Sequence, residues 1–120
     1  MEVSYSLFVQ RLAKPGAAIL ADLTPERMDL LHMAVGAAGE GGELLDAVKK
    51  VAIYGKAVDR ENVVEELGDL RFYMQGIMNN LNITDAEVEA HNRQKLEQRY
   101  NGLIYSNEAA IARADKGAGA

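Results

Sequence analysis

Two pairs of acidic residues stand out, because each pair is spaced three residues apart in a segment that favours helix. The first pair is Glu40 and Glu43, and the second is Glu66 and Asp69. Side chains three residues apart point from one face of a helix, so each pair could hold one hard cation. Two facing helices could bring the four carboxylates together, where they would repel one another strongly without a cation. Oxygen ligands in a chain without cysteine suit Mg²⁺ or Mn²⁺ better than Zn²⁺.

Helical phase separates Glu66 from its neighbour Glu65. At about 100° per residue, Glu66 falls inside the apolar stripe of its segment, whereas Glu65 points roughly 100° away, toward solvent. The stripe consists of Val63, Leu70, Tyr73 and Ile77. Asp69 lies at the edge of this stripe, about 60° from Glu66. A carboxylate in a core stripe is costly unless it is paired, neutralised or bound to a metal.

The segment around Glu40 carries two apolar stripes. The main one consists of Leu31, Val35, Ala38, Leu45, Val48 and Ala52. Glu40 shares the second stripe, which consists mostly of small residues and is flanked by Glu43. Its members are Met33, Gly36, Ala37, Leu44 and Ala47. Four glycines also cluster here, Gly36, Gly39, Gly41 and Gly42, although each costs about 0.5–1 kcal/mol relative to alanine in a helix. They indicate a bend, or close approach of another helix or a ligand.

The elements that must position these residues are helices. Apolar spacing and capping residues predict helices over residues 5–13, 24–54, 60–81, 85–100 and 106–113. Thr24, Asp59 and Thr84 are the expected caps of the three long helices, and residues 16–23 are expected to form a connection. Counted from these helix ends, the two acid pairs would be offset by roughly 6 Å in a symmetric hairpin.

We therefore predict an all-α fold, an antiparallel bundle of about four to five helices completed by oligomerisation. At 120 residues the chain is expected to be a single domain, 1–120, with a frayed tail at 116–120. The net charge of −5 argues against indiscriminate nucleic-acid binding. No apolar run approaches membrane-spanning length and no signal peptide is recognised, so a cytoplasmic protein is expected.

At this point the sequence resembles a known family. Glu-x-x-Glu, then 22 residues, then Glu-x-x-Asp is similar to the signature of the MazG-like, all-α nucleoside triphosphate pyrophosphohydrolases. The likeness covers roughly residues 24–100. Asn92, Lys95-Leu96 and Arg99-Tyr100 look like the family's Asn-x-x-Lys-Leu-x-x-Arg-Tyr stretch.

The resemblance implies a helical bundle that dimerises or tetramerises and hydrolyses a (d)NTP to the monophosphate and pyrophosphate. It also implies Mg²⁺, with Mn²⁺ as a substitute, held by four catalytic acids: Glu40, Glu43, Glu66 and Asp69. The substrate-binding residues it implies are Tyr73 for the nucleoside, Lys95 and Arg99 for the phosphates, and Asn92. Many relatives carry two adjacent glutamates at the start of the first motif. Here the first of these is Gly39, which would weaken a second metal or the activation of water.

Two other functional interpretations compete with the pyrophosphohydrolase. A di-iron carboxylate bundle needs two Glu-x-x-His motifs, and only Asp29-Leu30-Leu31-His32 comes near. His91 has no acid three residues before it. The more serious alternative is a non-catalytic helical oligomerisation or regulatory module with a vestigial metal site, which specific Mg²⁺ binding would argue against. The charges of Arg113 and Asp115 near the end of the chain receive no role from the sequence.

Overall fold

The computed structural model describes residues 2–117, and this range contains helices and no strand. The prediction of an all-α protein is confirmed. The chain divides into two compact units, Met1–Asn80 and Leu81–Ala120, and each is described by itself below. The expectation of a single domain stays a prediction. None of the helices within residues 2–117 is both long and apolar enough to cross a membrane.

The first unit begins with two short helices, α1 (Tyr5–Leu12) and α2 (Gly16–Asp22). The hydroxyl of Ser4 caps α1 by accepting a hydrogen bond from the amide of Leu7 at 3.3 Å. Helix α2 occupies most of residues 16–23, which were expected to form a connection whose structure the sequence left open. A single turn or two of alanine, isoleucine and leucine forms helix readily but is too short to display apolar periodicity.

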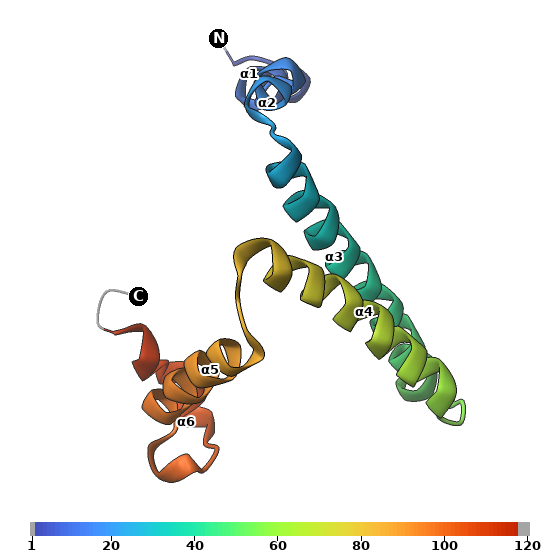
Figure 1. Cartoon of the computed structure of the whole chain (residues 1–120), viewed down its shortest axis with the longest axis vertical. Coiled ribbons are helices and arrows are strands. Elements are labelled where there is room, and N and C mark those ends of the chain that lie inside the picture. Colours follow the sequence, from blue (N-terminus) through green and yellow to red (C-terminus); the bar gives the residue numbers. More distant parts are fainter. Residues whose placement is uncertain (1, 118–120) are drawn as a thin grey trace. The chain divides into compact units, whose positions relative to one another are not determined.

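Two long helices, α3 (Pro25–Ala52) and α4 (Arg60–Leu81), form an antiparallel hairpin (Figure 1). The predicted caps are in place: Thr24 Oγ1 accepts from the amide of Arg27 at 3.2 Å, and Asp59 Oδ1 accepts from that of Asn62 at 3.1 Å. Helix α3 ends two residues earlier than the predicted Tyr54. Gly55, with φ of 63°, then lies in the connecting loop instead of directly after the helix.

Close contacts at two glycines set the register of the hairpin. A methyl group at Gly36 would overlap the ring of Tyr73, and one at Gly76 would overlap the side chain of Met33. In both pairs the residue numbers add up to 109, as expected for antiparallel helices in one register. The same register sets Glu40 level with Asp69, and Glu43 level with Glu66. The predicted offset of the two acid pairs is therefore absent, because the loop of residues 53–59 absorbs it.

The glycine cluster of α3 thus has one member that serves close approach to α4, Gly36. Added methyl groups at Gly39, Gly41 and Gly42 would meet no described atom within 4 Å. The second glycine that serves close approach, Gly76, lies on α4 and was not singled out in the sequence. Close packing therefore uses one glycine on each helix, less than one turn apart along the hairpin.

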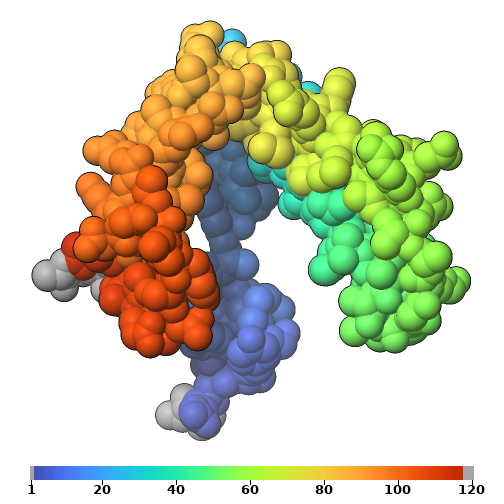
Figure 2. Space-filling view, turned by 90° about the horizontal axis from the view of Figure 1, so that it is seen from below, coloured from blue at the N-terminus to red at the C-terminus, as the bar shows by residue number. Residues whose placement is uncertain are grey.

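The stripe of α3 that faces α4 is the second one, with the small residues. Met33, Gly36 and Glu40 are half-buried, and Ala47, 8% exposed, is the only buried residue of the range 2–117. In Figure 2 the two helices, teal and light green, lie side by side toward the loop end of the hairpin. The main apolar stripe remains open: Val35 is 62% exposed and Leu45 68%. At about 100° per residue this stripe lies on the other side of α3.

The second unit is built on α5 (Asp85–Arg99). Three short segments pack against this helix. They are η1 (Asn101–Leu103), α6 (Asn107–Ala112) and η2 (Ala114–Lys116). The expected caps form: Thr84 Oγ1 accepts from the amide of Glu87 at 3.2 Å, and Ser106 Oγ from that of Ala109 at 3.1 Å.

The end of the chain departs from the prediction. Helix α6 ends one residue early, because Arg113 adopts a left-handed conformation with φ of 50°. Lys116 was expected to be frayed, but it closes η2 and donates its amide hydrogen to the carbonyl of Arg113 at 2.9 Å. Fraying was also expected at 118–120, which lie outside the described residues.

Candidate metal centre

Three of the four predicted acids meet across the hairpin. Glu40 of α3 and Glu66 and Asp69 of α4 each offer one carboxylate oxygen, and these three atoms lie within 4.8 Å of one another. Glu40 and Glu66 are half-buried, whereas Asp69 is exposed. Oxygens at this separation are close enough to bind a common cation, whose ligand distances in proteins are about 2.0–2.6 Å for Mg²⁺ or Ca²⁺.

Glu43, the fourth predicted acid, lies outside this group. It is exposed and sits one turn along α3 from Glu40, level with Glu66 in the register of the hairpin. Glu65 is exposed as well, so the helical phase distinguished it correctly from the half-buried Glu66. The structure therefore leaves a compact set of three carboxylates with a fourth next to it.

Crowding of negative charge marks Glu66 as the centre of the group. Its pKa is raised, first by burial, and then by the charges of Glu40, Glu43, Asp69 and Glu65, in that order. Burial and the neighbouring negative charges both disfavour the ionised carboxylate. A bound cation would favour the ionised form and so offset both effects. The donor set is made only of carboxylate oxygens, which are the ligands of Mg²⁺ and Mn²⁺. The residues present fit such a metal.

Tyr73, predicted to approach the nucleoside, is held by packing. Its half-buried ring lies against the backbone of Gly36. The ring of His32 meets it edge-on, with centroids 6.3 Å apart, and that of Phe72 does so at 5.2 Å. These contacts hold Tyr73 between the helices of the hairpin. Its contact with a nucleoside stays a prediction.

The three predicted substrate residues of the second unit all lie on α5. Asn92 and Lys95 are exposed. Arg99 is engaged by Asp115: its Nε donates to Oδ1 at 2.7 Å and a terminal nitrogen donates to Oδ2 at 3.2 Å. Exposed fractions are 16% for the arginine side chain and 2% for the aspartate. A role of these residues at a phosphate stays a prediction.

This ion pair was not foreseen from the sequence, although both charges were noted. Its hydrogen bonds raise the pKa of Arg99 and lower that of Asp115, and burial opposes both shifts. The partners are 16 residues apart, beyond any helical spacing. No sequence pattern indicated the pair, because the low exposure of the Asp115 side chain depends on the packing of η2 against α5.

Comparison with known proteins adds to this geometry. Residues 29–104 match the model of the MazG nucleotide pyrophosphohydrolase domain. The chain belongs to this family. The resemblance found in the acidic motifs is thereby confirmed, and the matched range includes all the candidate metal ligands and the predicted substrate residues.

One relative among curated proteins is the Gene 37 protein of Mycobacterium phage L5. It is 31% identical to this chain over 74 residues, which cover 58% of this chain and 65% of the relative. The chain thus spans just under two thirds of the relative's length. No solved structure matches the chain significantly.

Proposed function

We propose that this MazG-family chain is a Mg²⁺-dependent nucleoside triphosphate pyrophosphohydrolase. In this proposal it cleaves the bond between the α- and β-phosphates of a (d)NTP and releases the (d)NMP and pyrophosphate. The observation that carries the proposal is the meeting of Glu40, Glu66 and Asp69 across the hairpin of a chain that belongs to this family.

The roles of the acids follow from their positions. Glu40, Glu66 and Asp69 would hold Mg²⁺, or Mn²⁺ in its place, with Glu43 completing the shell directly or through water. A divalent cation, when bound, would neutralise the negative charge that develops on the phosphate oxygens. A carboxylate that remains free accepts the proton of the attacking water. The water oxygen forms a new bond to phosphorus as the bridging bond breaks and pyrophosphate leaves.

Cations are needed for the phosphates, and Lys95 and Arg99 are the proposed source, with Asn92 beside them on α5. Arginine suits bidentate contact with phosphate. The same geometry is what Arg99 now offers to Asp115. A phosphate can therefore take both hydrogen bonds of Arg99 only if it displaces the Asp115 carboxylate.

A second copy of the chain is the proposed partner. The main apolar stripe of α3 is exposed, and large apolar residues of α4 are exposed too, among them Val64 (52%) and Leu67 (48%). Apolar surface of this kind is usually covered by another protein surface. Packing of a second hairpin on these faces would complete a helical bundle, in keeping with the predicted homo-oligomer, a dimer or tetramer.

The test is incubation with each (d)NTP in the presence of Mg²⁺ or Mn²⁺, with products separated by chromatography. Monophosphate and pyrophosphate are expected. Glu66→Gln should abolish turnover while the far-ultraviolet circular dichroism is unchanged, and Glu65→Gln, the exposed neighbour, should keep it. Absence of turnover of every nucleotide would contradict the proposal and leave the non-catalytic oligomerisation or regulatory module. Calorimetric titration with Mg²⁺ then reports whether the metal site is vestigial.

A further inference from the structure

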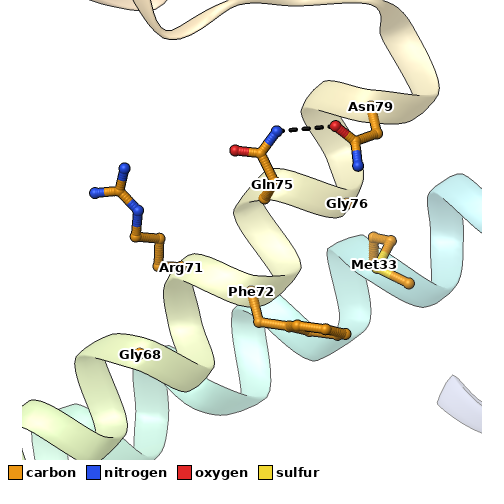
Figure 3. A pocket seen from close by; sticks show the side chains of 7 residues that line it. All are labelled: Met33, Gly68, Arg71, Phe72, Gln75, Gly76 and Asn79. Carbon is orange, nitrogen blue, oxygen red and sulfur yellow. Dashed lines mark hydrogen bonds between the residues drawn. The ribbon is translucent and has the colours of Figure 1, made fainter.

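A cavity of about 460 Å³ lies on the hairpin, on the side of α4 next to Met33 of α3 (Figure 3). Its lining combines an aromatic ring, Phe72, with two carboxamides, Gln75 and Asn79. Gly76, which brings Met33 close to α4, also lines it. The cavity lies wholly within the first unit, so its shape depends only on α3 and α4.

Glycine makes the aromatic ring accessible. Gly68 and Gly76 stand four residues before and after Phe72, so one turn of α4 on either side of the ring bears no side chain there. The Phe72 side chain is 65% exposed. In Figure 3 its ring extends from α4 over α3 toward Met33. The two glycines therefore leave part of the ring open to a flat molecule, with Gln75 next to it on the following turn.

The carboxamides form an ordered polar edge. Gln75 Nε2 donates a hydrogen bond to Asn79 Oδ1 at 2.8 Å, one helical turn away. This bond orients both groups and leaves Gln75 Oε1 as an acceptor and Asn79 Nδ2 as a donor. In Figure 3 a dashed line joins the two carboxamides between successive turns of α4. The edge thus offers a donor and an acceptor next to an apolar ring.

We propose that this cavity binds the nucleobase of the nucleotide substrate, with Phe72 as the stacking surface and Gln75 and Asn79 as the groups that read the base edge. The inference rests on the proposed function. A nucleobase has two apolar faces and a polar edge of donors and acceptors, and proteins bind such rings by aromatic stacking and carboxamide hydrogen bonds. An apolar helix packed on this face would instead leave the remaining carboxamide groups without hydrogen-bond partners.

The position of the cavity relative to the acids supports the same ligand. Gly68 directly precedes Asp69, and Phe72 follows Asp69 by three residues, about 4.5 Å along the axis of α4. On α3, Met33 precedes Glu40 by two turns, in the same direction along the hairpin. One nucleotide can thus have its phosphates at the acids and its base at the cavity. Phe72 would take the role that the sequence suggested for Tyr73.

Kinetics of the full chain with Mg²⁺ test the assignment. Gln75→Ala and Asn79→Ala should each raise KM for the preferred nucleotide roughly five- to tenfold, as loss of one hydrogen bond predicts, with kcat nearly unchanged. Phe72→Leu should raise KM about fivefold or more through lost stacking. Asn80→Ala is the matched control, because Asn80 is an exposed carboxamide one residue away that does not line the cavity. Equal KM values for all four variants and the parent chain would overturn the proposal.

A second readout does not depend on catalysis. Side-chain amide signals of Gln75 and Asn79 are followed by NMR while AMP, GMP, CMP or UMP is added without Mg²⁺. We expect at least one monophosphate to shift both signals in the parent chain and to shift them less in Phe72→Leu. If the parent chain hydrolyses no nucleotide, the pyrophosphohydrolase proposal fails, and this titration still decides whether the cavity binds a base. The base site would be overturned if no monophosphate shifted these signals. It would also be overturned if Phe72→Leu bound the monophosphate as well as the parent chain does and differed from it only in oligomeric state.

Discussion

The ring of Tyr73 lies against the backbone of Gly36, where a methyl group would overlap it. Together with the contact between Met33 and Gly76, this contact sets the register of α3 against α4. The register in turn sets Glu40 level with Asp69. A packing contact between an aromatic ring and a glycine therefore positions the acids of the metal centre.

Gly36→Ala should destabilise the protein. Forcing a methyl group against the Tyr73 ring costs about 1–3 kcal/mol, which outweighs the gain of up to about 1 kcal/mol in helix propensity. Urea unfolding measures the difference. Gly39→Ala is the control and should be neutral or stabilising, since its methyl group would meet no described atom within 4 Å. If Gly36→Ala were as stable as Gly39→Ala, the contact would not set the register.

Mg²⁺ affinity should fall as the pH is lowered. The fall should begin at a higher pH than it would at a site whose glutamates have their ordinary pKa. The pKa of Glu66 is raised by burial and by its acidic neighbours, so protons begin to compete with the metal above the usual range. Calorimetric Mg²⁺ titrations across pH 5–8 measure this, with Glu61→Gln as control, because Glu61 is an exposed acid of α4 that is not among the charges that raise the pKa of Glu66. An affinity that stays constant down to pH 5 would contradict it.

The metal-free protein should show the opposite trend. A raised pKa means that folded Glu66 binds protons more readily than unfolded Glu66. The free energy of unfolding contributed by this group therefore increases as the pH falls through its raised folded pKa toward the ordinary pKa of the unfolded chain. Glu66→Gln should remove that dependence and stabilise the metal-free chain at neutral pH, as urea unfolding in the presence of a chelator will show.

Asp115→Asn should loosen the second unit. The substitution removes the charge that receives both hydrogen bonds from Arg99 and leaves a half-buried guanidinium without its carboxylate. Hydrogen exchange at the amides of Lys116 and Gly117, which close η2, should accelerate. Asp46→Asn, which breaks an exposed pair with Lys50 at 3.5 Å, is the control and should leave this exchange unchanged. Unaltered exchange in Asp115→Asn would mean that the pair does not hold the segment.

The ion pair of Arg99 and Asp115 also predicts how stability changes with pH. Arg99 lowers the pKa of Asp115, so the stability from this carboxylate is fully present above its ordinary pKa and is lost as the pH falls through the lowered one. The carbon-13 signal of the Asp115 carboxyl should therefore titrate below that of an ordinary aspartate. Titration at or above the ordinary range would contradict the ion pair.

Oligomerisation should depend on the open stripe of α3. The double variant Val35→Gln/Leu45→Gln removes apolar surface from the proposed interface and should shift the protein toward monomer in sedimentation experiments. Asp46→Gln/Lys49→Gln changes two exposed polar residues of the same helix and should keep the oligomer. A parent chain that is monomeric at all concentrations would refute the interface outright.

The sequence by itself determined the helices and the acids. Caps at Thr24, Asp59 and Thr84 were readable because a cap depends on the residue itself and its immediate neighbours. Helical phase correctly separated Glu66 from Glu65 for the same kind of reason, since the angle between two side chains of one helix depends only on their spacing. The family followed from the acid motifs, which lie within those helices.

The tertiary structure decided which surfaces meet. The small-residue stripe of α3 faces α4, and the larger apolar stripe remains open, because Gly36 and Gly76 allow close approach and bulky side chains would not. That choice of face sets the register and brings Glu40 to Glu66 and Asp69 while Glu43 remains outside the group. The pairing of Arg99 with Asp115 likewise arises from packing between segments, which no spacing along one helix encodes.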